Sequence, residues 1–598
     1  MAVKSQEADL LKGGCVLRAP SDGQYVQNML FENNALSVRS GFGQVTQLDT
    51  TMAALKPTGT SAGQEWGYRK HLGSYLVRTA FGHEQMLSVF AADVYASNVA
   101  KNVSGYKNTK SNFISIYILS VYDLTTDSRW EEPLYRHTSS AALSALAPQD
   151  IQFLHPHYAT SADEDHQKWI RAVSEKPFYF AELFDVVYFG NPETGMLAYV
   201  PSAFRRSTPV EKYTGECHTH QLPRMMQLDT LGNKGWSDPF GESPLVVQAV
   251  ATSVSDDVDY LTDANFPHAF TATSFEDASG GFLVLVDKDR RTLWASEANN
   301  PTAIPSSGYF LFPGDELITA VAEQAGNVII WTENTTWYLR PSTSFLLFGE
   351  GARLVQLSDS SGCVGQHVVT GGAGFGSLYW MDKRGCYRST GNMSIENISA
   401  PIAPFFTDFV TNPLNVFFEE MLGGVTTGGG STIRDQARTM LRFGEEGANA
   451  TYDAKRRLVI FSVPAASIML VWNEEVQQWT FWNTQSIATE ESADGVIGVT
   501  ENIQNAWVQA SPDDLYVVGG IDTADGTIDS LTLNRSYYIL QYGRGGGVDR
   551  SVEEGEDHRL GVQHYVDKTH SGSVATVKNT AFIVGRPVPE PFGRSGMF

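Results

Sequence analysis

Several short stretches of the sequence carry residue types that could do chemistry. Residues 59–63 (GTSAG) have the G-x-S-x-G spacing of a nucleophile elbow, in which a strand–turn–helix exposes a serine hydroxyl. Lys56 and Pro57 precede this stretch in place of an apolar strand, which favours an ordinary Gly/Ser/Thr loop. The carboxylate pairs Asp256-Asp257 and Glu419-Glu420 could act as a glycosidase acid and base, but nothing fixes their separation, and solvated charge is the usual role of such pairs.

Histidines and a cysteine form a second candidate group. Zinc sites usually pair their ligands at C-x₂₋₄-C or H-x₃₋₅-H spacing. The segments HPH and CHTH have neither spacing, which favours solvent-facing or interface side chains at His155, His157, Cys217, His218 and His220.

One acidic segment could bind calcium, and three common catalytic or nucleotide-binding motifs are absent from the sequence. The segment from Asp522 to Gly526 hints at a calcium loop but lacks the D-x-D-x-D order and a distal Glu, and its Asp and Gly residues suit a hairpin turn. The chain contains no P-loop, G-x-G-x-x-G or H-E-x-x-H motif. We therefore expect a protein that is not an enzyme, with no catalytic residue, cofactor or metal.

A phenylalanine-rich stretch is more informative. Because exposed apolar clusters mark contacts with other molecules, it could form a subunit interface or an exposed tip, and the alternative is a segment that faces the core. Its members are Phe405, Phe406, Phe409, Phe417 and Phe418. A Gly-rich run follows at residues 423–432, and its composition predicts a flexible linker. The candidate gate residues in this linker are Gly423, Gly424, Gly428, Gly429 and Gly430.

Composition limits the function classes. The formal net charge of −24 is atypical of proteins that grip nucleic acid through its phosphates, because such binding needs clustered Lys and Arg. No run approaches the ~18 apolar residues that span a bilayer, and the N-terminus has no apolar core of a secretory signal, so we expect folding in a cytoplasm. Four cysteines are too few for a disulfide scaffold, and we expect Cys363 and Cys386 to be buried thiols.

Three strand–turn–strand units between residues 280 and 390 organise the chain. Their turns centre near Asp287, Glu333 and Asp382, which are 46 and 49 residues apart. A propeller blade of four strands takes about 40–50 residues. We therefore predict a mainly β fold, a β-propeller of four-stranded blades with an inserted or flanking platform domain and small helical pieces. Each blade holds two hairpins, so the three turns could occupy different positions within their blades. The alternative fold is a set of unrelated hairpins in sandwich domains.

The same pattern predicts further blades and the boundaries between segments. The next turn, near Asn473, lies 91 residues after Asp382, which fits two blades or one blade with an insertion. The predicted segments are an N-terminal arm and interface segment (1–60), the first propeller hairpins (61–136), an inserted platform and loop region with helices at 141–147 and 162–176 (137–279), the central blades (280–400), a Phe- and Gly-rich insertion (401–450), further blades (451–540) and a tail with a closing strand (541–598).

The order of the strand motifs resembles a known family. An early RSGF at residues 39–42 is followed in order by LWAS (293–296), GDELI (314–318), VIIW (328–331), TWYL (336–339), CVG (363–365), LYWMD (378–382) and WTFW (479–482). This order is similar to that of the tail nozzle proteins of short-tailed bacteriophages, also called tail tubular protein B, and of their β-propeller relatives. The resemblance is clearest over residues 280–485.

The resemblance implies a structural virion protein of the phage tail. It implies a homo-oligomeric ring, commonly of six copies, which lies below the portal and the adaptor (the head-to-tail connector), forms the distal part of the DNA ejection channel, and holds tail fibres or spikes. It implies no catalytic residue. Carboxylates that face the lumen would let DNA pass without specific binding. The candidate gate is one of two insertions, 203–279 or 423–450.

Two other functions remain open from the sequence. The first alternative is a virion-associated or extracellular β-propeller that binds or hydrolyses glycans. The second is a propeller adaptor that only binds other proteins in a cell.

Overall fold

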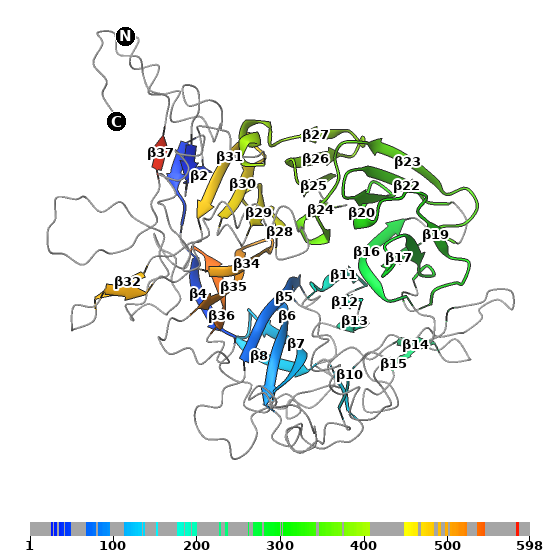
Figure 1. Ribbon diagram of the computed structural model, residues 1–598, viewed down its shortest axis with the longest axis horizontal. Helices are drawn as coiled ribbons and strands as arrows, with labels where there is room; N and C mark the ends of the chain where they lie inside the picture. The colour runs from blue at the N-terminus through cyan, green and yellow to red at the C-terminus, as the bar shows by residue number, and fades with distance from the viewer. Residues whose placement is uncertain are drawn as a thin grey trace, which may run out of the picture.

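Seven antiparallel sheets lie side by side in a ring in the described part of the computed structural model (Figure 1). The structure describes residues 25–48 (except 28, 33–34 and 41), 67–78, 82–95, 113–137 (except 134), 151–153, 176–199 (except 185 and 193), 226–228, 234–236, 261, 267–299 (except 278–279), 301, 303–406 (except 343–345 and 373–375), 448–463, 468–483, 488–491, 497–499, 503–522, 535–543 and 582–584.

Each sheet is one blade, and its strands follow one another in sequence, except that strands from the chain ends join blades 6 and 7. Blade 1 is β5 (Gly67–Arg78), β6 (Glu84–Tyr95), β7 (Phe113–Asp123) and β8 (Ser128–Pro133). Blade 2 is β11 (Tyr179–Leu183), β12 (Val186–Asn191) and β13 (Gly195–Tyr199). Blade 3 is β16 (Ala269–Asp277), β17 (Gly280–Asp287), β18 (Thr292–Ala295) and β19 (Tyr309–Leu311). Blade 4 is β20 (Ile318–Gln324), β21 (Asn327–Thr332), β22 (Thr336–Arg340) and β23 (Arg353–Ser358).

The remaining blades follow the same order. Blade 5 is β24 (Thr370–Gly372), β25 (Ser377–Met381), β26 (Cys386–Thr390) and β27 (Ile395–Asn397). Blade 6 contains β28 (Asn449–Asp453), β29 (Leu458–Val463), β30 (Ile468–Asn473) and β31 (Gln478–Asn483). Blade 7 contains β34 (Ile503–Ala510), β35 (Leu515–Asp522) and β36 (Arg535–Tyr542).

Short elements lie outside this scheme. Four two-stranded sheets are β2 (Met29–Glu32) with β3 (Ala35–Val38), β9 (Tyr135–His137) with β10 (Ile151–Phe153), β14 (Met226–Leu228) with β15 (Lys234–Trp236), and β32 (Ala488–Glu491) with β33 (Ile497–Val499). The helical elements of the described residues are the 3₁₀ helices η7 (Gln366–Val368) and η8 (Ala400–Phe405). Among these residues no helix is long and apolar enough to cross a membrane.

The first strand of each blade faces the centre of the ring. These strands contact one another in turn, from β11 through β16, β20, β24, β28 and β34 to β5. The backbone N–H of Phe178, next to β11, donates to the carbonyl of Leu72 in β5 at 2.8 Å, which joins the last pair. The chain is therefore a seven-bladed β-propeller. The propeller predicted from the 46- and 49-residue spacing is confirmed, the number of blades comes from the structure alone, and the alternative of unrelated sandwich hairpins is wrong.

Both ends of the described chain complete the ring. β4 (Phe42–Gln47) pairs with β36 as the fourth strand of blade 7. β1 (Tyr25–Gln27) lies parallel to β31, and β37 (Phe582–Val584) pairs with β1, so blade 6 has six strands. The segment predicted to be an N-terminal arm thus contributes one strand to each of two blades, and β4 supplies the backbone partners that the edge of β36 needs.

The apolar runs of the middle strands follow from burial on both faces of a blade. In β17, Leu283 and Leu285 pack toward blade 2, whereas Val284 and Val286 pack toward blade 4. Successive side chains of a strand point to opposite faces, so a blade that lies between two others needs apolar residues at every position. The core is therefore divided among the interfaces between neighbouring blades.

The structure shows which two strands of its blade each of these turns connects. The turns near Asp287, Glu333 and Asp382 each join the second and third strands of a blade, whereas Asn473 lies between the third and fourth strands. The 91-residue interval contains one blade boundary with an insertion, because β28 begins at residue 449 and directly follows blade 5 in the ring.

The predicted platform region differs from the structure. Residues 179–199 of the segment 137–279 form blade 2, and β16 of the same segment is the inner strand of blade 3. The prediction of one inserted platform is therefore wrong for these residues. Long polar stretches of sequence on both sides of residues 179–199 interrupt the spacing between blades there. The predicted helices at 141–147 and 162–176 lie outside the described residues, apart from Lys176, which is not in a helix.

Side-chain amides join neighbouring blades where backbone pairing stops. Asn449 of β28 donates from Nδ2 to the carbonyl of Val508 at 2.7 Å and accepts from the Val508 N–H at 3.2 Å. Replacement Asn449→Ala would leave both buried backbone groups without these partners, and we expect a loss of about 2–3 kcal/mol in the free energy of unfolding. Urea unfolding checks this. Asn392→Ala, at an exposed turn, is the matched control, and an equal loss there would contradict the role of Asn449.

Candidate functional site

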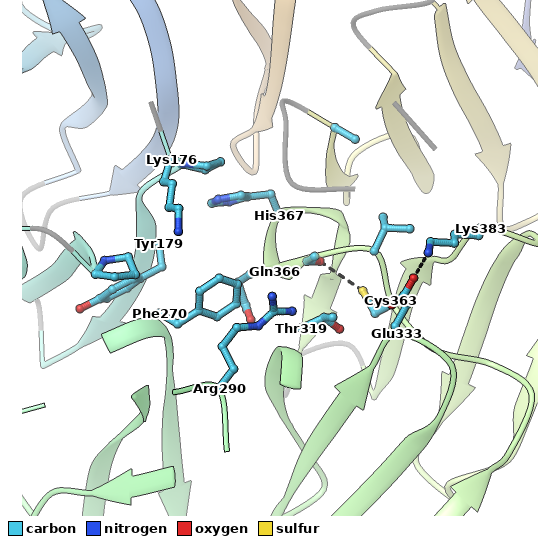
Figure 2. A pocket seen from close by; sticks show the side chains of 15 residues that line it. Lys176, Tyr179, Phe270, Arg290, Thr319, Glu333, Cys363, Gln366, His367 and Lys383 are labelled. Atoms are coloured by element: carbon cyan, nitrogen blue, oxygen red, sulfur yellow. Dashed lines mark hydrogen bonds and ion pairs between the residues drawn. The ribbon is translucent and has the colours of Figure 1, made fainter. Parts of the chain in front are cut away.

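A pocket of about 360 Å³ opens at one end of the propeller (Figure 2). The turns between the second and third strands of blades 2 to 5 each supply one lining residue, namely Pro192, Arg290, Glu333 and Lys383. The rest of the wall comes from the starts of the first strands β11, β16 and β20 and from the connections that lead into first strands, among them Lys176 before β11 and the segment 363–367 before β24. The pocket therefore lies where the repeated turns of neighbouring blades converge on the ring axis.

Arg290 is fixed from two sides. Its Nε donates to the carbonyl of Ile318 at 2.8 Å, and its guanidinium lies 4.5 Å from the centre of the Phe270 ring. The turn that carries it is held by Asp289, whose carboxylate accepts N–H groups of Arg291 and Thr292 at 2.8 and 2.9 Å. Burial alone would raise the pKa of Asp289, but these hydrogen bonds, with the Thr292 hydroxyl, lower it. The cation is thus positioned before any ligand binds.

The opposite wall holds an ion pair. Lys383 of blade 5 and Glu333 of blade 4 are paired, and both side chains are exposed. Asp382, next to Lys383, accepts the N–H groups of Arg384 at 2.5 Å and Gly385 at 2.9 Å and so shapes the turn. Burial raises the pKa of Asp382, and the hydrogen bonds from the turn only partly offset this. The negative charge of Glu333 is therefore balanced within the pocket by Lys383.

Aromatic side chains fill the propeller axis beside this pocket. His367 of η7 lies 4.7 Å from Trp507 of blade 7, and His71 of blade 1 lies 5.4 Å from the same indole (centroid distances). The Trp507 Nε1 donates to the carbonyl of Ser74 at 2.9 Å. Burial lowers the pKa of His71 to about 3 and that of His367 to about 4, so both rings are neutral at pH 7. Side chains from blade 1, from blade 7 and from the connection before blade 5 thus meet near the centre of the ring.

A close backbone approach shapes the pocket wall. A Cβ on Gly362 would lie 2.2 Å from the carbonyl oxygen of Glu333, which is a backbone atom. We therefore expect Gly362→Ala to lower the free energy of unfolding by about 1–3 kcal/mol, because the connection to β24 must move away from the Glu333 turn. Urea denaturation measures the loss. Gly391→Ala, where the nearest atom lies at 3.7 Å, is the matched control, and equal losses in the two variants would refute the steric argument.

The structure places two of the predicted phenylalanines inside the subunit. Phe405 in η8 is buried, and its ring lies 5.9 Å from that of Phe481 in blade 6. The prediction of an exposed tip or subunit contact is therefore wrong for Phe405, because η8 seals the core between blades 5 and 6. Phe406 is half-buried and packs on the same cluster. Phe409, Phe417 and Phe418 lie outside the described residues, as do the linker residues Gly423, Gly424, Gly428, Gly429 and Gly430.

Most of the other candidate residues also lie outside the described residues. These are residues 59–63, His155, His157, Cys217, His218, His220, Asp256, Asp257, Glu419, Glu420 and 523–526. Asp522 ends β35 and pairs in register with Arg535. Cys363 and Cys386 are buried free thiols, as expected. The described residues hold no group of three or more His, Cys, Asp or Glu that could bind a metal.

Sequence reasoning missed the pocket. Its charged residues lie in four blades, and each one resembles an ordinary turn residue in its own hairpin. A signal was nevertheless available, because turns of equal phase lie at the same face of a propeller. The pattern that located Asp287, Glu333 and Asp382 also marks this face.

Comparisons with known proteins leave the family open. No protein-family model matches the chain, and no curated protein matches it either. Among solved structures, the AfRom2 CNH domain is similar at 6% identity over 79% of this chain and 98% of that chain, with a TM-score of 0.31. Kluyveromyces lactis Hsv2 is similar at 9% identity over 58% and 69%, with a TM-score of 0.25. Trypanosoma rangeli sialidase, in complex with the inhibitor DANA, is similar at 10% identity over 88% and 58%, with a TM-score of 0.27.

Proposed function

We propose that this chain is a structural subunit of a bacteriophage tail, a nozzle protein that assembles into a ring, commonly of six copies, around the DNA ejection channel. The order of strand motifs from residue 280 to residue 485 suggests this role. The ring would lie in the virion tail after assembly in the host cytoplasm, below the adaptor, and would hold tail fibres or spikes.

The filled axis of the propeller is the observation that carries this proposal. His367, which precedes blade 5, and His71 of blade 1 both contact Trp507 of blade 7, and we therefore place the path of DNA outside the single subunit. A DNA channel must then be enclosed between subunits. The formal charge of −24 would make the wall of that channel repel phosphates and let DNA slide without specific binding.

The outer edges of blades 3 and 4 offer a surface for a neighbouring copy. The last strands of these blades carry exposed apolar side chains, with Tyr309 48% exposed, Leu311 61% exposed and Val355 41% exposed. Large apolar side chains at sheet edges are typical of surfaces that pair with another chain. A ring of identical subunits places one such edge against each neighbour.

Electron microscopy of the full chain, alone and in phage particles that contain it, tests the proposal. We expect a ring with an open centre in assembled material and density at the distal end of the tail. Leu311→Arg should prevent ring formation, whereas Leu317→Arg, the same change at a side chain that lies outside these edge strands, should not. Particles in which the chain lies away from the tail would contradict the proposal, and normal rings of Leu311→Arg would refute the proposed contact.

The glycan-active alternative would use the axial pocket. Glycoside hydrolysis commonly needs two carboxyl groups about 5–10 Å apart. Glu333 supplies the carboxylate on the described lining, and Lys383 is paired with it. Release of reducing sugar from host-surface glycans by wild-type protein, and its loss in Glu333→Gln, would favour this alternative over the nozzle.

A further inference from the structure

The outer strand of blade 4 has an open edge. β23 is the last strand in the order β20-β21-β22-β23, and Figure 1 shows it at the rim of the ring. It has six residues, whereas the outer strands β13, β19 and β27 of blades 2, 3 and 5 have five, three and three. An antiparallel edge strand leaves alternate N–H and C=O groups without a ladder partner. β23 therefore offers backbone donors and acceptors to one more strand.

The side chains of β23 are accessible on one face and anchored on the other. Val355 is 41% exposed, and Arg353 is exposed as well. Leu354, between them, packs on the core shared by blades 3 and 4. Because successive side chains of a strand point to opposite faces, Arg353 and Val355 share the face that turns away from this core. The strand is thus fixed in place while its edge and one face stay open.

Two arginines lie together on the open face. Arg340 of β22 and Arg353 of β23 are directly opposite each other in the strand register, and both are exposed. Directly opposite side chains have Cβ atoms about 4.5–5.5 Å apart. Among the described residues neither arginine has an ion pair or a side-chain hydrogen bond. Glu350, the carboxylate in the sequence between them, is exposed and pairs with neither in the described structure. The open edge therefore carries two neighbouring positive charges that no carboxylate balances.

These charges select the kind of strand that can pair here. Charged side chains at an edge usually prevent pairing with another chain. Because both charges have the same sign, the barrier is selective: a basic strand would add a further cation, whereas carboxylates would remove the repulsion between Arg340 and Arg353. Guanidinium groups also bind carboxylates through two parallel hydrogen bonds. The edge therefore fits an extended acidic segment.

A second copy of the chain has the chemistry that this edge fits. The sequence contains 67 Asp and Glu against 43 Lys and Arg, so the surface of another copy is rich in carboxylates. Blade 3, which contacts blade 4 through β16 and β20, carries the exposed Tyr309 and Leu311 at its own outer edge. The cationic edge is thus continuous with the apolar side chains that we assign to the contact between copies.

We propose that β23 pairs with an extended acidic segment of a neighbouring copy, whose carboxylates bind Arg340 and Arg353. This inference rests on the proposed ring, and it defines one of the two surfaces that meet in it. Because a cationic edge does not complement itself, the other surface must be a different part of the neighbour. Such a heterologous contact is the type that builds a cyclic ring.

Sedimentation velocity of the full chain tests the charges. We expect the wild-type chain to assemble at about 50 mM NaCl and to dissociate at about 500 mM, because salt screens exposed charges. Arg340→Glu and Arg353→Glu should each weaken the association by at least about tenfold. Lys288→Glu makes the same charge change at an exposed turn of blade 3 and should alter it by less than about twofold. Equal effects of Lys288→Glu and Arg353→Glu would show a response to net charge alone and overturn the assignment, as would a wild-type chain that stays monomeric at low salt.

Hydrogen exchange tests the strand pairing. The backbone amides of residues 353–358 should exchange at least about tenfold more slowly in assembled than in dissociated wild-type protein, since pairing protects edge amides. A peptide of alternating Glu and Val should inhibit assembly, and one of alternating Lys and Val should not. Unchanged exchange in β23 on assembly would rule out the pairing.

The outcomes separate this inference from the nozzle proposal. If Arg353→Glu still forms normal rings at the end of the tail, the nozzle role stands and the assignment of β23 fails. If the wild-type chain assembles through β23 but is absent from phage tails, the assignment stands and the nozzle role fails.

Discussion

Phe42→Ala is expected to lower the free energy of unfolding by about 3–5 kcal/mol. Phe42 begins β4, the strand that completes blade 7, and its side chain is fully buried. Its ring lies 5.4 Å from that of Tyr542 and 6.4 Å from that of Trp482, so one side chain joins the N-terminal strand to blades 6 and 7. Removing the ring leaves a cavity where the propeller closes, and edge-to-face aromatic contacts are lost with it.

Urea unfolding followed by tryptophan fluorescence measures this loss, since Trp482 reports on the same contact. Phe184→Ala is the matched control, because the Phe184 side chain is 48% exposed, and we expect a loss below about 1 kcal/mol there. If Phe42→Ala costs no more than Phe184→Ala, β4 does not contribute to closure of the ring.

Acid is expected to destabilise the protein through two buried histidines. The pKa of His71 falls to about 3 in the folded chain and that of His367 to about 4, against an ordinary value of 6.5. The unfolded chain therefore binds protons at a higher pH than the folded chain. The stability that these neutral rings contribute is complete above pH 6.5 and is lost as the pH falls toward their folded pKa values. Each histidine should cost about 2 kcal/mol between pH 7.5 and pH 5.

Urea midpoints at pH 7.5 and pH 5 measure this effect. His367→Gln should remove about half of the pH-dependent loss, because one buried imidazole no longer titrates. A wild-type midpoint that does not change between these pH values would contradict the burial of His71 and His367. A total near 4 kcal/mol is a large part of the stability of a typical domain, about 5–15 kcal/mol.

The sequence predicts the propeller where the blades follow one another without long loops. From β16 to β27, Asp and Gly residues shape tight hairpin turns and the middle strands are apolar throughout, so the period is visible. The repeat spacing of the sequence does not reveal blade 2, because long polar segments separate it from both neighbours. The pairing of β4 with β36 is hidden for another reason, since strand partners almost 500 residues apart leave no local pattern.

No single local motif marks the pocket, because ring closure creates it. Lys176, Arg290 and Lys383 are each unremarkable in their own segments, and only the order of blades around the axis brings them together. The motifs considered in the sequence analysis, such as zinc and calcium sites, take their functional residues from one short segment. In a propeller, residues that share a site are spaced by about one blade.

The order of pairing in blade 7 has a consequence during synthesis. β4 leaves the ribosome early, but its partner β36 is made only when residue 535 and those after it have been added. At about 5–20 residues per second, β4 waits about 25–100 s for that partner. Throughout this time Phe42 has no core to enter, and the ring cannot close before translation is almost complete. Final folding of this protein is therefore a late event, set by the ribosome's progress through the last blade.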